Sequence, residues 1–370
     1  MVDLNKIVDR FLKEDFDDNQ INKFFGPYEA AYFAYAQDET IRKNAASGGT
    51  VTAILWNLLR RKEIDGALVC RSVILDGMVK PEFVIATSLQ DLGESQGSKY
   101  ISTRFIREAI PLIERFTGDL AVVTLPCDAK ILKSYLDHHP AAHRRVKVVI
   151  SLFCGHLSTK RLTKHVIDQM RPTKEAEMVD FRYRSGHWRG KLTAKFNENS
   201  IVERPFSIFS DYQNLNFFSE RKCLHCFDHT GYYSDISLGD IWLQGMKADS
   251  IKHSAVIAKT KIGLDIVEKT SQDGDLTLIK KPISLIAEGQ SRSLKIHYNI
   301  SARAKAGRFL GVQIKDHVNE KVRWVDFIIA FILIFNHKFT QLSWGRKLVY
   351  WIPRPLIKAY LYFLKGLEIL

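Results

Sequence analysis

The sequence is poor in cysteine, and it has no internal repeat and no tract dominated by Pro, Ser, Gly or any single residue. The absence of such tracts excludes a fibrous or low-complexity chain. The apolar run Phe327–Phe335 is nine residues long, well below the roughly 20 that span a bilayer as a helix. What is present, 46% apolar and 26% charged residues in a chain of 370, is typical of a folded protein with one large or two fused domains.

Five cysteines occur, an odd number spread over a long chain. The polar, acidic start of the chain lacks the basic and apolar regions of a secretory signal. We therefore expect a cytoplasmic protein, in which a C-x-x-C pair indicates a metal or redox site more often than a disulfide. That pair is Cys223 and Cys226.

Positive charge is concentrated near the end of the chain. The formal net charge is +13, and residues 303–370 carry +8 of it among Trp, Phe, Tyr and aliphatic residues. Two interpretations fit this tail: amphipathic segments at the inner face of the cell membrane, or a helical layer packed on the protein itself or on another subunit. Nucleic acid is not an expected partner, because no sequence signature of a nucleic-acid-binding fold accompanies the basic residues.

Apolar periodicity predicts an α/β fold with a mainly parallel sheet in residues 1–175, where short β-rich runs alternate with helical patterns of 10–15 residues. Residues 176–300 have short alternating runs and turn residues, which predict a smaller α+β part with antiparallel hairpins. Residues 301–370 are expected to form the basic, aromatic helical tail.

Two further cysteines follow predicted strands, Cys127 in "LPC" and Cys154 in "FCGH". Open α/β sheets place their sites at the carboxyl ends of strands, so these thiols could converge with the C-x-x-C pair. Four thiolates can hold an iron–sulfur cluster or zinc, and chemically idle buried cysteines are the rival interpretation. Cys70, inside an apolar strand, is expected to belong to the core.

Two loops before predicted helices could bind a phosphate-containing cofactor. Glycines allow close approach of the backbone, and a helix N-terminus offers unpaired N–H groups to an anion. Ordinary helix capping explains the same residues without any ligand. The first loop is formed by Ser47, Gly48, Gly49 and Thr50, and the second contains Gly97, Lys99, Tyr100, Ser102 and Thr103.

Three more polar residues are candidates for the site. His156, two residues after Cys154, could donate a proton at a redox site or only bond its own loop. Asp235 and Asp240 flank an apolar turn, where a carboxylate could accept a hydrogen bond from a ribose hydroxyl or cap the turn. Composition does not separate these alternatives.

Taken in order, seven stretches resemble the family of coenzyme F420 hydrogenase/dehydrogenase beta subunits, which includes iron–sulfur flavoproteins such as 7-hydroxymethyl chlorophyll a reductase. They lie between about residues 40 and 270: "IRKNAASGGTVTAILWNLLRRKEIDGALV", "GSKYISTRF", "LAVVTLPCDAKIL", "FCGHLSTKRL", "VDFRYRSGHWRG", "CLHCFDHTGYYSDISLGDIW" and "SAVIAKTKIGLDIVEKT".

The resemblance implies a flavin- and iron–sulfur-dependent oxidoreductase. It implies that Cys127, Cys154, Cys223 and Cys226 ligate one 4Fe-4S cluster, that FAD lies against the two loops, and that the turn from Asp235 to Asp240 lies near cluster or flavin. Coenzyme F420, NAD(P)H or ferredoxin could exchange electrons with it, and bacterial relatives suggest a polysaccharide- or lipid-linked substrate. An oligomer or a subunit of a complex is expected.

The chain also departs from the family pattern. Many members carry an N-terminal ferredoxin-like domain, for which no cysteines precede Cys70, so a separate electron donor is expected. "TLPCD" replaces the more usual "GxPCQ", and "FCGH" replaces a "CHG" order. The rival hypothesis is a non-catalytic module in which the four thiolates hold structural zinc and the tail docks on a membrane or partner protein.

Overall fold

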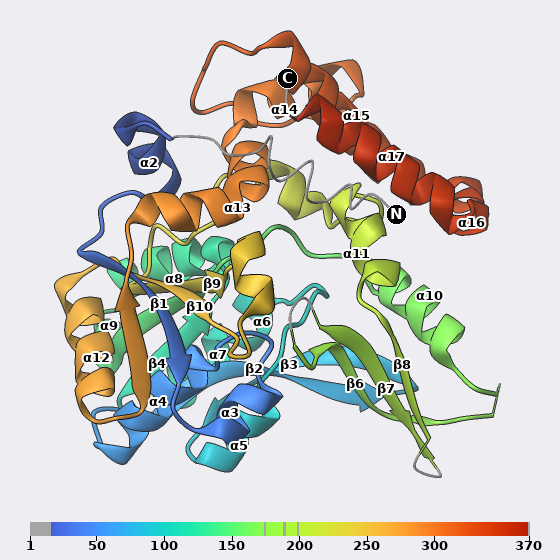
Figure 1. Cartoon of the computed structure of the whole chain (residues 1–370). Helices are drawn as coiled ribbons and strands as arrows, with labels where there is room; N and C mark the ends of the chain where they lie inside the picture. Colours follow the sequence, from blue (N-terminus) through green and yellow to red (C-terminus); the bar gives the residue numbers. More distant parts are fainter. Residues whose placement is uncertain (1–15, 174, 188–189, 198–199, 369–370) are drawn as a thin grey trace.

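An eight-stranded sheet forms the centre of the computed structural model, which describes residues 16–173, 175–187, 190–197 and 200–368 (Figure 1). The first fifteen residues, on which the expectation about a signal peptide rests, lie outside this part. The strand order is β11-β1-β10-β9-β5-β4-β2-β3. Its strands are β1 Ala30–Ala36, β2 Gly66–Leu75, β3 Met78–Ala86, β4 Leu120–Thr124, β5 Val146–Leu152, β9 Ile236–Asp240, β10 Ser254–Ala258 and β11 Leu276–Lys280.

The predicted parallel α/β layer is confirmed in the four central strands, β9, β5, β4 and β2, which run parallel to one another. Antiparallel strands extend the sheet at both edges. The carboxyl ends of the four central strands therefore meet at one edge of the sheet, where Thr124, Leu152 and Asp240 end β4, β5 and β9.

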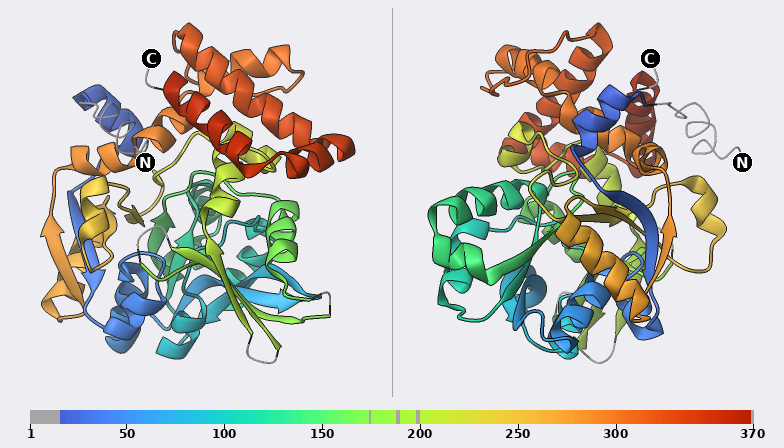
Figure 2. Two further views of the ribbon diagram at one scale, coloured as in Figure 1. Left: turned by 45° about the vertical axis from the view of Figure 1, so that its right-hand side comes forward. Right: turned by 90° about the vertical axis from the view of Figure 1, so that its left-hand side faces the viewer.

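Side-chain alternation lets the sheet bury both of its faces. On β2, Ala67 and Val69 pack with helices α4 (Thr50–Arg60) and α12 (Lys261–Gln272), whereas Leu68 points to the opposite face. Several helices cover that opposite face, and Figure 2 shows the two layers from the side. They are α2 Asp18–Phe25, α6 Phe105–Glu108, α7 Ile110–Arg115, α8 Pro126–His138, α9 Pro140–Arg145 and α13 Ile283–Tyr298.

The predicted division at about residue 175 does not match the sheet, because β9, β10 and β11 belong to the same sheet as β1–β5. What separates them in the chain is a small antiparallel sheet, which confirms the predicted hairpins: β6 Met178–Ser185, β7 Lys191–Phe196 and β8 Ile201–Pro205. The remaining short helical segments connect the strands of the two sheets along the chain. They are α3 Glu39–Asn44, α5 Leu89–Glu94, α10 Lys160–Met170, α11 Ser207–Asn214, η2 Arg221–His225 and η3 Gln244–Ala248.

The tail is helical, as predicted, and much of it packs on the protein itself. Leu333, Val349 and Leu361 are buried in one cluster with the small sheet and with α10 and α11. The tail helices are α14 Ile300–Phe309, α15 Trp324–Gln341, α16 Ser343–Trp351 and α17 Arg354–Leu367. In the described residues no single helix meets the length and hydropathy of a bilayer span, although α15 and α16, bent by 109° at their junction, meet them when taken together.

Candidate functional site

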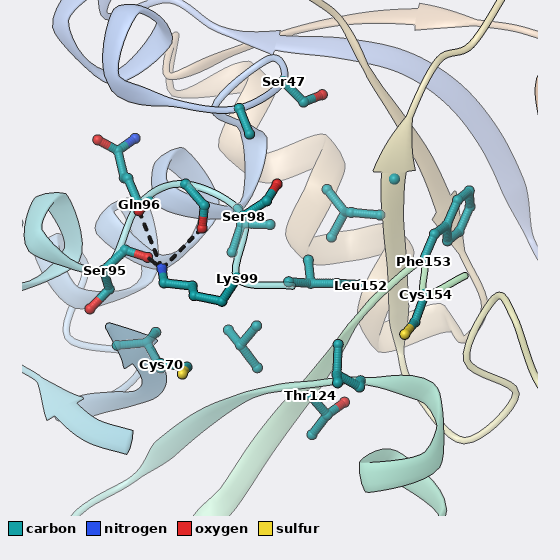
Figure 3. Close-up of a pocket in the computed structure, with 18 of the residues that line it drawn as sticks. Ser47, Cys70, Ser95, Gln96, Ser98, Lys99, Thr124, Leu152, Phe153 and Cys154 are labelled. Carbon is teal, nitrogen blue, oxygen red and sulfur yellow. Dashed lines mark hydrogen bonds between the residues drawn. The ribbon is translucent and has the colours of Figure 1, made fainter. Parts of the chain in front are cut away.

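A cavity of about 300 Å³ opens at the carboxyl edge of the parallel strands (Figure 3), and we call it the large cavity because many segments of the chain line it. Its walls come from the ends of β4, β5 and β9, from the start of α4 and from the loop after α5. Ten of the residues predicted from the sequence line it: Ser47, Gly49, Thr50, Gly97, Lys99, Tyr100, Thr103, Cys154, His156 and Asp240. The two candidate loops and the strand ends, far apart in the chain, thus meet at one site.

The loop before α4 is fixed by contacts with two strands. Gly49 has a φ of 77°, in the left-handed region that favours glycine. A side chain on Gly48 would stand 2.6 Å from the backbone oxygen of Ala34, so this glycine is required by packing and does not line the cavity. Since the first N–H groups of a helix have no partner within the helix, α4 offers its N-terminal donors at the cavity, where Thr50, Val51 and Thr52 lie.

Lys99 serves the second loop rather than the open space. Its buried ammonium donates to the carbonyl oxygens of Gln96 at 3.2 Å and Gly97 at 3.0 Å, and also to that of Ser95 (Figure 3). Burial lowers its pKa to about 8. Lys99 therefore shapes the loop, while Ser102 does not line the cavity.

Two buried polar atoms on the cavity wall have no hydrogen-bond partner among the described residues, Thr103 Oγ1 and His156 Nε2. Burial lowers the pKa of His156 to about 4, so its imidazole is neutral near pH 7. Unsatisfied buried polar atoms are costly unless a ligand or water meets them. A polar ligand in the cavity would offer these two atoms a partner.

Asp240 is already engaged by a residue to which sequence reasoning gave no role. Its carboxylate pairs with the guanidinium of Arg184 on β6, a buried side chain that also donates to the carbonyl of Ala46 at 3.1 Å. Arg184 lies 4.9 Å above the ring of Trp242. The only signal in the sequence was its place in the stretch "FRYRSGHWRG".

Asp235 does not line the cavity. Its carboxylate accepts from the backbone N–H of Val149 at 2.9 Å and from the hydroxyl of Thr260 at 2.8 Å. It therefore caps the opposite end of β9 and the start of α12, and the structure does not bring it to the cofactor loops.

The four cysteines of the predicted ligand set line a second cavity of about 430 Å³, hereafter the cysteine cavity. Cys127 lies in the first turn of α8, Cys154 follows β5, and the C-x-x-C pair lies on and just after η2. Burial raises the pKa of all four thiols, that of Cys223 to about 12. Cys70 lines the large cavity instead, and burial raises its pKa to about 11.

A buried arginine holds the C-x-x-C loop, and sequence reasoning missed it. Arg303 on α14 donates to the carbonyl oxygens of Leu224 at 2.8 Å, of Cys226 and His297 both at 2.6 Å, and of Cys223 at 3.4 Å. Burial lowers its pKa to about 10. Lys130, Lys222 and Asp228 line the same cavity, so charges of both signs surround the four thiols.

The two cavities share a wall, because Leu125, Cys154, His156 and Leu157 line both. Polar contacts also link Cys154 to Asp240. His229 Nδ1 lies 3.0 Å from the carbonyl oxygen of Cys154 and its Nε2 lies 3.1 Å from the side-chain oxygen of Gln290, and a neutral ring donates to one of the two. Gln290 in turn donates to the carbonyl of Asp240 at 2.6 Å. The described residues contain no group of three or more His, Cys, Asp or Glu placed to hold a single metal ion.

Comparison with known proteins agrees with this architecture. Residues 31–107 match the N-terminal family model of the coenzyme F420 hydrogenase/dehydrogenase beta subunit, and residues 117–282 match the corresponding C-terminal model. A solved structure of the F420-reducing [NiFe] hydrogenase complex from Methanosarcina barkeri matches 82% of this chain and 99% of its own with a TM-score of 0.59 and 18% identity, which shows a shared fold.

Two sequence relatives are similar over part of their length. An uncharacterized protein of Methanocaldococcus jannaschii is 30% identical over 64% of this chain and 62% of its own length. A subunit of the F(420)H(2) dehydrogenase of Methanosarcina mazei is 23% identical over 64% of this chain and 60% of its own. The chain thus spans about three fifths of these relatives. With both family models matched in order, the chain belongs to the family of coenzyme F420 hydrogenase/dehydrogenase beta subunits.

Proposed function

We propose that this protein is an oxidoreductase that binds FAD in the large cavity and a 4Fe-4S cluster in the cysteine cavity. Such a flavin supplies two-electron hydride chemistry, and such a cluster carries single electrons. The observation that carries the proposal is the shared wall, since Cys154 and His156 line both cavities. Electrons could therefore pass between the two groups over a short distance.

The cysteine cavity suits the cluster. Its four thiols come from three segments, its volume of about 430 Å³ exceeds what one zinc ion needs, and two lysines line it together with Asp228. All four thiol pKa values are raised, so the protein alone holds these groups neutral. Bound metal deprotonates coordinating thiols outright, and Cys127, Cys154, Cys223 and Cys226 would be the ligands.

The large cavity suits a flavin nucleotide. The N-terminal amides of α4 can bind a phosphate group, and Thr103 and His156 each present a buried polar atom without a protein partner among the described residues. Leu55, Val69 and Leu238 supply apolar surface for a ring system. These residues bind and orient the cofactor and exclude water from it.

The names of the relatives support the choice of coenzyme F420 as the electron partner. The family model names coenzyme F420, and the M. mazei relative belongs to an F(420)H(2) dehydrogenase. We propose reduced coenzyme F420 as the hydride carrier, with NAD(P)H or a ferredoxin as the alternatives, and we propose that the chain works with a separate electron-transfer protein as its partner. A polysaccharide- or lipid-linked compound is proposed as the final acceptor.

Cofactor content tests this proposal. Protein purified without oxygen should contain about four iron, four acid-labile sulfide and one FAD per chain. Cys223→Ala should lose the iron and keep most of the FAD. The matched variant Cys70→Ala, outside the ligand set but on the wall of the large cavity, should keep the iron. A colourless protein with one zinc ion, or iron content unchanged by Cys223→Ala, would refute the assignment.

A further inference from the structure

The outer end of the tail exposes large apolar side chains on one helix face. On α16, Trp344 is 59% exposed, Leu348 51% and Trp351 85%, and their spacing of four and three residues places them on the same side. Leu342, just before α16, and Phe335 on α15 are exposed as well. We call these five residues the tail surface, and Figure 1 shows α16 at the far end of α15 and α17, away from the large sheet.

Ring contacts make the tail surface continuous across the α15–α16 junction. The ring centroids of Phe335 and Phe339 lie 5.8 Å apart, and those of Phe339 and Trp344 lie 5.1 Å apart. The opposite side of α16 is anchored, because Val349 is buried against the protein. The exposed face is therefore held in place rather than left to collapse onto the core, and contiguous exposed apolar surface of this kind marks an interaction site.

The positive charge around the tail surface indicates the kind of partner that it binds. Residues 327–367 contain six Lys or Arg and no Asp or Glu. Lys338 and Lys347 are exposed on α15 and α16, and Arg346 lies beside them with its guanidinium 2.7 Å from the carbonyl of Gln341. A surface that joins cations to Trp and Leu, with no carboxylate nearby in the chain, complements an anionic partner with an apolar interior.

We propose that the tail surface docks on an anionic lipid bilayer, with α16 lying in the interface. Trp rings favour the headgroup level, and lysines there meet anionic lipid. Protein interfaces are depleted in Lys, and a second copy of this chain would bring two strongly basic surfaces together. The 109° bend between α15 and α16 places α16 across the direction of α15, which suits a helix lying along a surface. This inference is independent of the cofactors.

Vesicle flotation of the full-length protein tests the proposal. The protein should float with vesicles of phosphatidylcholine mixed with phosphatidylglycerol, and much less with phosphatidylcholine alone. Lys347→Gln should weaken binding to the anionic vesicles by about fivefold, the effect of one cation at such a surface. The combined variant Trp344→Ser, Leu348→Ser and Trp351→Ser should weaken it by at least about a hundredfold.

A matched control replaces three exposed apolar residues elsewhere, Leu75→Ser, Ile106→Ser and Ile201→Ser, and should float like the unaltered protein. Circular dichroism should show both triple variants folded. Failure of the unaltered protein to float overturns the proposal, and so does equal flotation of the tail variant. Resistance of the bound protein to alkaline carbonate would also overturn it, because that result requires α15 and α16 to be inserted through the bilayer.

Discussion

Cys154 and His156, two residues apart on the loop after β5, line both the large cavity and the cysteine cavity. The loop is fixed from behind, since the backbone N–H of Cys154 donates to the carbonyl of His229 at 3.0 Å. One short segment therefore places a thiol and an imidazole in the wall between the two proposed cofactors.

Replacing His156 by Leu should raise the Kd for FAD. It should not lower the stability of the FAD-free protein. The Nε2 atom of His156 is buried without a protein partner among the described residues, so its loss would remove the proposed hydrogen bond to FAD and no bond of this atom within the described protein. One such bond is worth about 1 kcal/mol, or roughly a fivefold to tenfold rise in Kd. Fluorescence titration with FAD and thermal melting of the FAD-free protein measure the two effects; a lower melting temperature with unchanged Kd would contradict the role.

Arg303→Ala should destabilise the C-x-x-C loop. Its guanidinium donates to four backbone carbonyl oxygens. The substitution would leave these buried oxygens without that donor. We expect the free energy of unfolding to fall by about 3 kcal/mol and iron to be lost on gel filtration. Arg303→Lys keeps the charge but not the forked geometry, so it should give an intermediate loss.

Arg308, exposed on the same helix, provides the control for Arg303. Arg308→Ala should retain its iron and change the unfolding free energy by no more than about 0.5 kcal/mol. Urea unfolding with iron analysis measures both variants. Iron retained in Arg303→Ala at the level of Arg308→Ala would show that Arg303 does not hold the loop.

Asp240→Asn should destabilise the protein, because it breaks the ion pair between Asp240 and Arg184. The Arg184 side chain is buried and that of Asp240 is partly buried, and removing one partner of a buried pair leaves an uncompensated charge. We expect a loss of about 2–4 kcal/mol in unfolding free energy. The exposed pair of Lys191 and Glu203 is the matched comparison, for which Glu203→Gln should cost less than about 1 kcal/mol.

A double-mutant cycle distinguishes two roles of the Asp240 carboxylate: pairing with Arg184, or bonding directly to the cofactor. If the carboxylate serves Arg184, then Arg184→Met should remove most of the cost of Asp240→Asn. Additive losses, together with a weaker FAD affinity in Asp240→Asn alone, would favour a direct bond from Asp240 to the cofactor.

Gly239→Ala should damage the large cavity. A side chain at this position would stand 2.0 Å from the ring of Phe153, next to Cys154. The ring or β9 must move, at a cost of about 1–3 kcal/mol, and FAD content should fall. Gly245→Ala is the control, because nothing lies within 4 Å of the added group, and a loss in Gly245→Ala as large as that in Gly239→Ala would contradict the packing explanation.

Local periodicity predicted most of the elements that build the site. The strands ending at Thr124 and Leu152 and the helix that begins at Thr50 lie where apolar alternation and helical spacing place them. The approach of Cys127 and Cys154 also follows, because parallel strand ends share an edge, whereas the family resemblance joined Cys223 and Cys226 to them in one ligand set. These features depend on short-range pattern, which a sequence records directly.

Long-range pairing was not predictable in the same way. The Ala-rich β1 was not predicted, and its partners β10 and β11 lie more than 200 residues away in the sequence. The hydrogen-bond partners of individual side chains were not predicted either. Asp235 bonds Val149 and Thr260, and Lys99 bonds its own loop. Arg303, from the tail, bonds the C-x-x-C loop. Such choices depend on tertiary neighbours that no local pattern specifies.

The visible absorbance of anaerobically purified protein, recorded before and after addition of reduced coenzyme F420, tests the central claim most directly. We predict overlapping flavin and iron–sulfur bands in the isolated protein and the bleaching of both after addition, because the two cofactors would lie on either side of the wall formed by Cys154 and His156. Bleaching by NAD(P)H or reduced ferredoxin alone would keep the two-cofactor account and replace the proposed donor. A protein without flavin bands, or one whose cluster bands persist when the flavin is reduced, would contradict it.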